Sequence, residues 1–139
     1  MATSAQIEQA ILNRFATMWD AQVAPGAYAI ENEGAEFAED QSWARILFRY
    51  ARPDPTQQSV GQVIRRQRQG VFLVQIRAPK DAGTVRIGDL EDAVVAEFED
   101  INKRTLNVKF GAVFPTRLGV RDGWMRSDVS IIFTWDHHG

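Results

Sequence analysis

The apolar residues of this chain recur at two spacings, one typical of helices and one typical of strands. Helical spacing predicts a first helix over residues 4–19 and a second over residues 84–101. Thr3, followed by Gln6, has the pattern of a capping box at the start of the first helix. Each helix carries one apolar stripe, which suits packing against a sheet. The stripes consist of Ile7, Ile11, Phe15, Met18 and Trp19 in the first helix and of Ile87, Leu90, Val94, Phe98 and Ile101 in the second.

Alternating apolar and polar positions predict the strands. A short strand is expected over residues 28–32, and longer ones over 42–52, 71–78, 106–118 and 124–135. Residues 63–69 can extend the third of these, with Gly70 as a bulge or bend between the two parts. Asp122 and Gly123 predict a tight hairpin turn. The apolar faces are predicted to comprise Ala44, Ile46, Phe48 and Tyr50; Phe72, Val74, Ile76 and Ala78; Val108, Phe110, Ala112 and Phe114; and Met125, Val129, Ile131, Phe133 and Trp135, with a break at Ser127.

This order of elements predicts an α+β fold. We expect two helices packed on one face of a mostly antiparallel sheet of four to five strands, in the order α-β-β-β-α-β-β. The acidic stretch 31–41 and the polar stretch 56–61 are expected to be loops. The sequence shows no internal repeat and no linker, so residues 1–139 are predicted to form a single domain.

Charge is distributed in blocks, although the formal net charge is only −2. Residues 31–40 carry five acids and no base, and residues 89–100 carry six acids and no base. Between them, residues 41–78 carry seven arginines and one acid, Asp54. Arginine forms ordered, planar pairs with carboxylates at interfaces. The blocks therefore predict either solvated faces or complementary surfaces, within one chain or between copies of it.

Few residue combinations suited to catalysis or metal binding occur in the sequence. There is no cysteine, and the two histidines, His137 and His138, are neighbours whose side chains diverge in an extended segment. The glycines form no phosphate-binding motif. We therefore assign no catalytic residue, no cofactor and no metal. No apolar run is long enough to span a membrane and the N-terminus lacks a signal-peptide pattern, which favours a soluble intracellular protein.

The strongest chemical signal is the cluster of Arg65, Arg66 and Arg68. These side chains suit contact with nucleic-acid phosphates or with an acidic surface of a neighbouring subunit. A solvated edge strand, on which charge prevents aggregation, explains them equally well. No recognition-helix pattern accompanies the cluster, so base-specific reading of DNA is not expected.

A second group of residues is predicted to contact a partner. Trp43 and Trp124 lie on the less apolar sides of their strands, and Arg45 and Arg49 share the side of Trp43. Tryptophan and arginine are enriched among the residues that dominate binding at protein interfaces. These four residues are therefore candidates for contact with another chain.

The layout of the whole chain resembles the tail terminator (tail completion) proteins of long-tailed bacteriophages. The matching residues include the segment from Arg68 to Ile76, which reads Arg-Gln-Gly-Val-Phe-Leu-Val-Gln-Ile. It fits the pattern Arg-x-Gln-Gly-x-Phe-x-Val-x-Ile, except that no residue separates the arginine from the glutamine. The resemblance covers most of the chain and rests on fold-like patterns, not on a catalytic signature. It also includes Pro79 and Gly83, the helix with Leu90, Ala93 and Phe98, the turn Asp122, Gly123 and Trp124, the strand from Val129 to Phe133, and Ile7, Leu12 and Phe15 of the opening helix.

The resemblance implies a structural protein without enzymatic activity. Such proteins form a ring, commonly of six subunits, that caps the tail tube, stops its polymerisation and offers a docking surface to the head–tail connector. DNA passes through the ring, so the Arg65, Arg66 and Arg68 cluster would lie at a subunit boundary or in the lumen. The implied location is the virion tail, after assembly in the host cytoplasm. There are two alternative functions. The chain could be another phage neck or head–tail joining protein, or it could be a small hydrolase.

Overall fold

The computed structural model describes residues 3–23, 26–30, 41–50, 65–100, 103 and 105–138. The predicted polar loop 56–61 and all but the last residue of the predicted acidic loop 31–41 lie outside these ranges. The elements are α1 (Ser4–Gln22), β1 (Tyr28–Ile30), β2 (Trp43–Tyr50), β3 (Arg65–Pro79), a 3-10 turn η1 (Lys80–Ala82), α2 (Gly83–Glu99), β4 (Val108–Arg121) and β5 (Trp124–His138).

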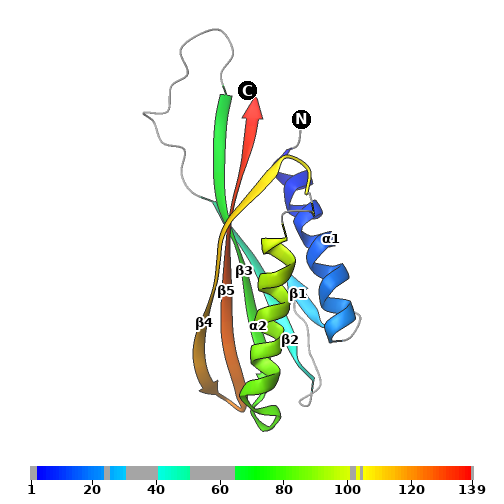
Figure 1. Cartoon of the computed structure of the whole chain (residues 1–139), viewed down its shortest axis with the longest axis vertical. Helices are drawn as coiled ribbons and strands as arrows, with labels where there is room; N and C mark the ends of the chain where they lie inside the picture. Colours follow the sequence, from blue (N-terminus) through cyan, green and yellow to red (C-terminus); the bar gives the residue numbers. More distant parts are fainter. Residues whose placement is uncertain are drawn as a thin grey trace.

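The five strands form one sheet in the order β1-β2-β3-β5-β4. Only the β1–β2 pair is parallel, and the other three pairs are antiparallel. Figure 1 shows the long β3 and β5 strands at the centre of this sheet, with α1 and α2 lying next to each other in front of it. The described chain therefore has the predicted α+β class, with two helices and a mostly antiparallel five-stranded sheet.

The start of α1 and the turn between β4 and β5 follow from local sequence. The Thr3 side chain accepts a hydrogen bond from the Gln6 backbone N–H, and the Gln6 side chain accepts one from the Thr3 backbone N–H, so the capping box is confirmed. Asp122 and Gly123 both have positive φ, at 53° and 83°. Two consecutive residues with positive φ define the tight turn that suits the right-handed twist of a hairpin.

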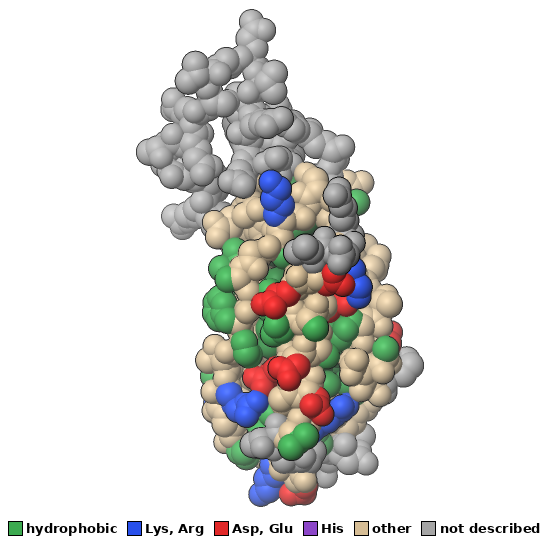
Figure 2. Space-filling model, viewed as in Figure 1, with side chains coloured by type: hydrophobic (Ala, Val, Ile, Leu, Met, Phe, Trp, Pro, Cys, Tyr) green, Lys and Arg blue, Asp and Glu red, His purple; other side chains and the backbone are tan. Residues whose placement is uncertain are grey.

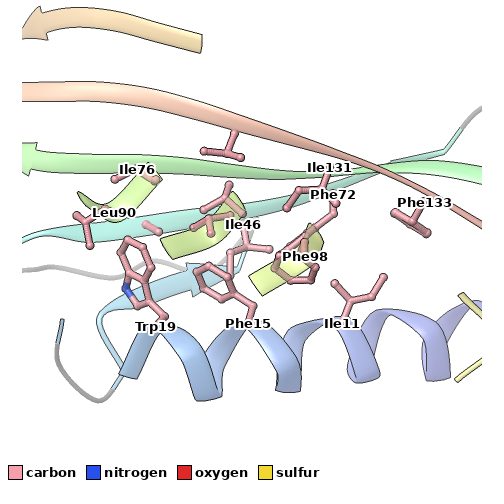
Figure 3. Packing of buried hydrophobic residues seen from close by; sticks show 14 of the residues in the cluster. Ile11, Phe15, Trp19, Ile46, Phe72, Ile76, Leu90, Phe98, Ile131 and Phe133 are labelled. Carbon is pink, nitrogen blue, oxygen red and sulfur yellow. The ribbon is translucent and has the colours of Figure 1, made fainter. Parts of the chain in front are cut away.

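The core lies between the helices and one face of the sheet (Figure 3). Phe15 of α1 is central, because its ring packs edge-on against Phe72 of β3 at 5.9 Å and stacks on Trp19 at 5.4 Å. Trp19 also donates its indole N–H to the backbone carbonyl of Ala27 at 2.8 Å, which satisfies its buried polar atom. The fully buried side chains from the strands include Ala44, Ile46, Phe72, Val74, Ile76, Ala78, Val129, Ile131 and Phe133.

Gly70 does not form the predicted bulge. β3 continues through it, and Gly70 pairs in regular register with Tyr50 of β2 and Phe133 of β5. A Cβ atom at this position would lie 2.6 Å from Cζ of Phe133 and 3.0 Å from the backbone oxygen of Arg49. Glycine is required here because the phenyl ring of the neighbouring strand occupies the space that a side chain would need.

The predicted alternation of β4 is also wrong in its second half. The register shifts between Phe110 and Val113, so Val113 replaces Ala112 as the next residue packed against the core. Phe114 is consequently 46% exposed. A bulge adds one residue to one strand and reverses which way the following residues face, here up to the second register shift between Arg117 and Gly119. Pro115 is accommodated because β4 is an edge strand and lacks a partner on its outer side.

Two polar networks join the layers. Arg14 of α1 pairs with Glu97 of α2 at 3.2 Å, donates to the Thr105 hydroxyl at 3.0 Å, and lies 5.1 Å from the ring centroid of Phe98. The Glu97 carboxylate also pairs with Lys103 at 2.6 Å. The Arg14 and Glu97 side chains are only 9% and 11% exposed, so this pair links α1, α2 and the start of β4 inside the molecule.

The second network lies at Ser127, where the predicted apolar face of β5 is interrupted. Ser127 is fully buried, and its hydroxyl donates to the Glu91 carboxylate of α2 at 2.6 Å. Arg117 of β4 donates to the other oxygen of the same carboxylate. Glu91 is 5% exposed, so it is a buried charge that is paired and hydrogen-bonded. The break in the apolar face thus accommodates a polar link between α2 and the sheet.

Candidate interaction surface on the open face of the sheet

The face of the sheet opposite the helices presents side chains of a different kind, in rows that run across β2, β3 and β5. The register places Trp43, Arg77 and Arg126 in one row, and Arg45, Gln75 and Asp128 in the next. Further rows contain Leu47, Leu73 and Ser130, and then Arg49, Val71 and Ile132. All these residues are half-buried except Arg49, which is exposed. We call this set of residues, together with Trp124 and Phe114, the open sheet face.

Positive charge dominates the open sheet face. It carries four arginines, whereas Asp128 is its single described acid. Asp128 pairs with Arg77 at 3.4 Å. Burial lowers the pKa of Arg77, the Asp128 carboxylate opposes that change, and the nearby Arg126 and Arg45 lower the pKa further. The pKa of Arg77 thus reflects both its carboxylate partner and its two arginine neighbours.

Two tryptophans border the basic rows. Trp43 and Trp124 come from distant parts of the sequence, yet their rings pack edge to face with centroids 6.0 Å apart. The Arg45 guanidinium lies 6.0 Å from the Trp43 ring. Large aromatic rings beside arginines, half-buried on one face of a sheet, are typical of the residues that anchor protein–protein contacts.

The centre of the open sheet face is apolar. Leu47 and Leu73 are neighbours on adjacent strands, and Val71 and Ile132 are neighbours on the next pair. Phe114 of β4 extends this patch across the sheet, since it pairs with Ser130. An apolar centre with charged side chains around it is the usual composition of a surface that binds another protein.

The four predicted partner residues meet on this face. Trp43, Arg45, Arg49 and Trp124 all belong to the open sheet face. Arg65 and Arg66 lie at the far end of β3, where their backbones pair with His138 and His137 at the end of β5. The side chains of these four terminal residues lie outside the described part of the structure. Arg68 is half-buried and pairs with Trp135.

Sequence reasoning missed Arg77, Arg126 and Phe114 as members of this surface. Arg77 was expected on the outer side of its strand, but nothing in the sequence placed it next to Arg126, 49 positions later. Strand alternation indicates which side a residue faces, but only the pairing register indicates which residues are its neighbours. The exposure of Phe114 depends on a bulge that has no clear sequence signal.

Other concave or titratable features are weaker candidates. A hollow of about 830 Å³ lies between the end of α2 and the start of β4. Its acids, Glu99 and Asp100, share the lining with Lys103 and Lys109. Within the described ranges, histidine, aspartate and glutamate side chains do not gather in a group of three suited to a metal ion. Neither of the two described helices is long and apolar enough to cross a membrane.

Comparisons with known proteins support the fold. The chain is similar to a solved structure that aligns over 100% of this chain and 99% of its own, with a TM-score of 0.74 and 15% sequence identity. The name of that structure carries no functional description. At this identity, the likeness shows a shared fold alone. No family model matches the sequence, and no curated protein matches it.

Proposed function

We propose that this chain is a tail terminator of a long-tailed bacteriophage. In this role, copies of the chain assemble into a ring, six being the number that the resemblance implies. The ring caps the tube of tail tube protein, stops its growth and presents a docking surface to the head–tail connector, with DNA passing through its lumen. The protein would act without a cofactor, assemble in the host cytoplasm and remain in the virion tail.

The observation that carries this proposal is the open sheet face. Neither of the two described helices covers this side of the sheet, and it combines two tryptophans, four arginines and an apolar centre. A surface of this composition suits contact with another folded protein better than the binding of a small substrate. A ring-forming structural protein needs such a surface, because each subunit contacts two neighbours as well as the tube and the connector.

The segment that carries much of the sequence resemblance also contributes to the candidate surface. The segment from Arg68 to Ile76 that carries much of it forms the central strand β3. Its even-numbered residues from Gly70 contribute to the core, and its odd-numbered residues contribute Val71 and Leu73 to the open sheet face. The same segment therefore accounts for both the fold and part of the candidate surface.

A tube-growth assay tests the proposal directly. Purified chain is added to tail tube protein from the same phage while the tube polymerises on a tail-tip complex, and tube lengths are measured by electron microscopy. We expect growth to stop, with the chain located at one end of each tube. A phage lacking the gene should make tails of abnormal length that do not join heads.

Two outcomes would contradict this function. Tubes that grow to the same length with and without the chain, and that never carry it at an end, would show that it does not terminate tails. Tails of normal length that fail only to attach to heads would instead assign the chain to the neck or head–tail joining proteins. Heads and tails that assemble normally without it would exclude both roles.

A further inference from the structure

The outer surface of α2 carries an acidic stripe. Asp89, Asp92 and Glu99 are exposed and recur at helical spacing, and we call these three residues the acidic helix stripe. The single base of α2, Arg86, donates to the carbonyl of Gln22 at 3.1 Å. Figure 2 shows acidic side chains gathered on the side of the molecule where α2 lies. Because the opposite stripe of α2 packs into the core, these acids point away from the sheet.

We propose that the open sheet face of one copy binds the acidic helix stripe of a second copy. This inference rests on the proposed function and deepens it, because it assigns the two surfaces through which neighbouring subunits meet. Arg45, Arg49 and Arg126 supply positive charge on one side, and the carboxylates of α2 supply negative charge on the other. The contact is head to tail, so each copy uses its sheet for one neighbour and its helix for the next.

The geometry excludes the same contact within one chain. The acidic helix stripe and the open sheet face lie on opposite sides of the two-layer fold, since α2 covers the other face of the sheet. A chain cannot bring these two surfaces together without unfolding. Two surfaces on opposite sides of the described fold can contact two different neighbours at the same time, which a repeating assembly requires.

The charges on the two surfaces also match in spacing. Arg45 and Arg49 are four residues apart on β2, which separates their Cα atoms by about 13 Å. Asp89 and Glu99 are ten residues apart on α2, which separates theirs by about 15 Å along the helix axis. A helix laid along β2 can therefore place carboxylates near both arginines while its apolar positions meet the apolar centre of the face. Ala96, which is exposed on the same side of α2 between Asp89 and Glu99, is one such position.

The β4 edge of the sheet is a poorer place for association. β4 contains Pro115, which cannot donate a backbone hydrogen bond, and two register shifts that bend the strand. Such features discourage the addition of another strand along an edge. These features of β4 thus favour contact between faces over the addition of a strand at this edge.

Charge-reversed variants of the full chain test the proposal. Arg45→Glu acidifies the sheet face, and Asp92→Lys makes the helix stripe basic. Lys80→Glu and Asp81→Lys are matched controls, because they change the same charges at exposed positions in η1. Self-association is measured by sedimentation velocity at about 50 mM and about 500 mM salt, since screening weakens contacts between exposed charges. Circular dichroism and thermal unfolding verify that each variant is folded.

We expect the wild type and both controls to self-associate, more strongly at the lower salt concentration. Arg45→Glu and Asp92→Lys should each raise the dissociation constant at least about tenfold. An equimolar mixture of these two variants should regain association, because the acidified sheet of one suits the basic helix of the other. Misfolding cannot produce this recovery, so the mixture separates a lost contact from a damaged fold.

Several results would overturn the proposal. A wild type that remains monomeric at every concentration, variants that associate like the wild type, or a mixture that does not recover would each do so. DNA binding that Arg45→Glu abolishes, without any self-association, would assign the face to nucleic acid instead. If Arg45→Glu is monomeric yet stops tube growth, the subunit contact is not needed for termination. If copies associate through these faces but never stop tube growth, this inference stands and the proposed function fails.

Discussion

Replacing Gly70 with alanine should destabilise the protein by overpacking the centre of the sheet. The new Cβ would lie 2.6 Å from Cζ of Phe133, whereas carbon atoms pack best at about 3.5–4.0 Å. The ring must therefore move by about 1 Å. It has little room, because Phe133 is fully buried and stacks on Trp135 with centroids 5.6 Å apart. On the other side, the backbone oxygen of Arg49 lies 3.0 Å from the new atom and is fixed in the sheet.

Insertion of one methyl group into a well-packed core costs about 1–3 kcal/mol. Both close contacts here involve rigid groups, so we expect a loss of about 2–3 kcal/mol in the free energy of unfolding. For a domain of this length, each kcal/mol of lost stability lowers the Tm by about 3–5 °C. Urea denaturation at a fixed protein concentration measures the free energy, and holding the concentration constant removes any contribution from self-association.

Gly111→Ala is the matched control. Gly111 also lies in the sheet, but its new Cβ would have no neighbour closer than 3.7 Å, which is an ordinary contact. Its effect should stay within about 0.5 kcal/mol. Phe133→Leu removes the outer atoms of the ring, so combining it with Gly70→Ala should cost at least about 1 kcal/mol less than the sum of the two single variants.

The reasoning would be refuted by a Gly70→Ala variant as stable as the wild type. Additive costs in the double variant would also refute it, because they would show that the Phe133 ring is not what the alanine meets. In either case the glycine would have to be explained by backbone conformation and not by the close approach of a neighbouring strand.

Three further predictions concern other parts of the fold. Gly88→Ala should stabilise the protein by about 0.5–1 kcal/mol in the same denaturation assay, since Gly88 lies within α2 and its new Cβ meets nothing closer than 3.7 Å. Arg14→Ala should cost about 2–4 kcal/mol, because it leaves the Glu97 carboxylate buried with only its lysine partner, and less should be lost when Glu97 is also replaced by alanine. Burial and the nearby Glu8 carboxylate raise the pKa of Tyr50 above its ordinary value of 10.0. The folded state therefore favours the neutral phenol. This contribution to stability is complete below about pH 10 and is lost at higher pH, where the tyrosine of the unfolded chain ionises. Tyr50→Phe should therefore lose less stability than the wild type between about pH 10 and pH 12, and equal slopes would contradict this explanation.

The elements could be predicted from the sequence because their signals are local. The apolar stripes with Phe15 and Leu90 required helices, and the alternation around Ile46 and Val74 required strands with one buried face. The Thr3 capping box and the Asp122 turn are local as well, since each involves residues within a few positions of one another. Such patterns are fixed by helix and strand geometry before any tertiary contact forms.

The candidate surface was only partly predictable. Its β2 members, Trp43, Arg45 and Arg49, were recognised because alternation placed them opposite the core. Their neighbours Arg77 and Arg126 depend on the pairing of β2 with β3 and of β3 with β5. Pairing between strands far apart in the sequence is decided by the packing of the entire core, which no short window of sequence contains.

The stretch around Gly70 shows where the two kinds of information separate. The sequence by itself determined that β3 is an apolar strand preceded by arginines and that a glycine interrupts its pattern. Only the tertiary structure decided that this glycine leaves room for the Phe133 ring and does not bend the strand. It also decided that Ser127 meets Glu91, and that the arginines beside Trp43 and Trp124 share one open face. The physical reason is that propensity and periodicity act between near neighbours, whereas close approach and charge clustering depend on which strands lie side by side.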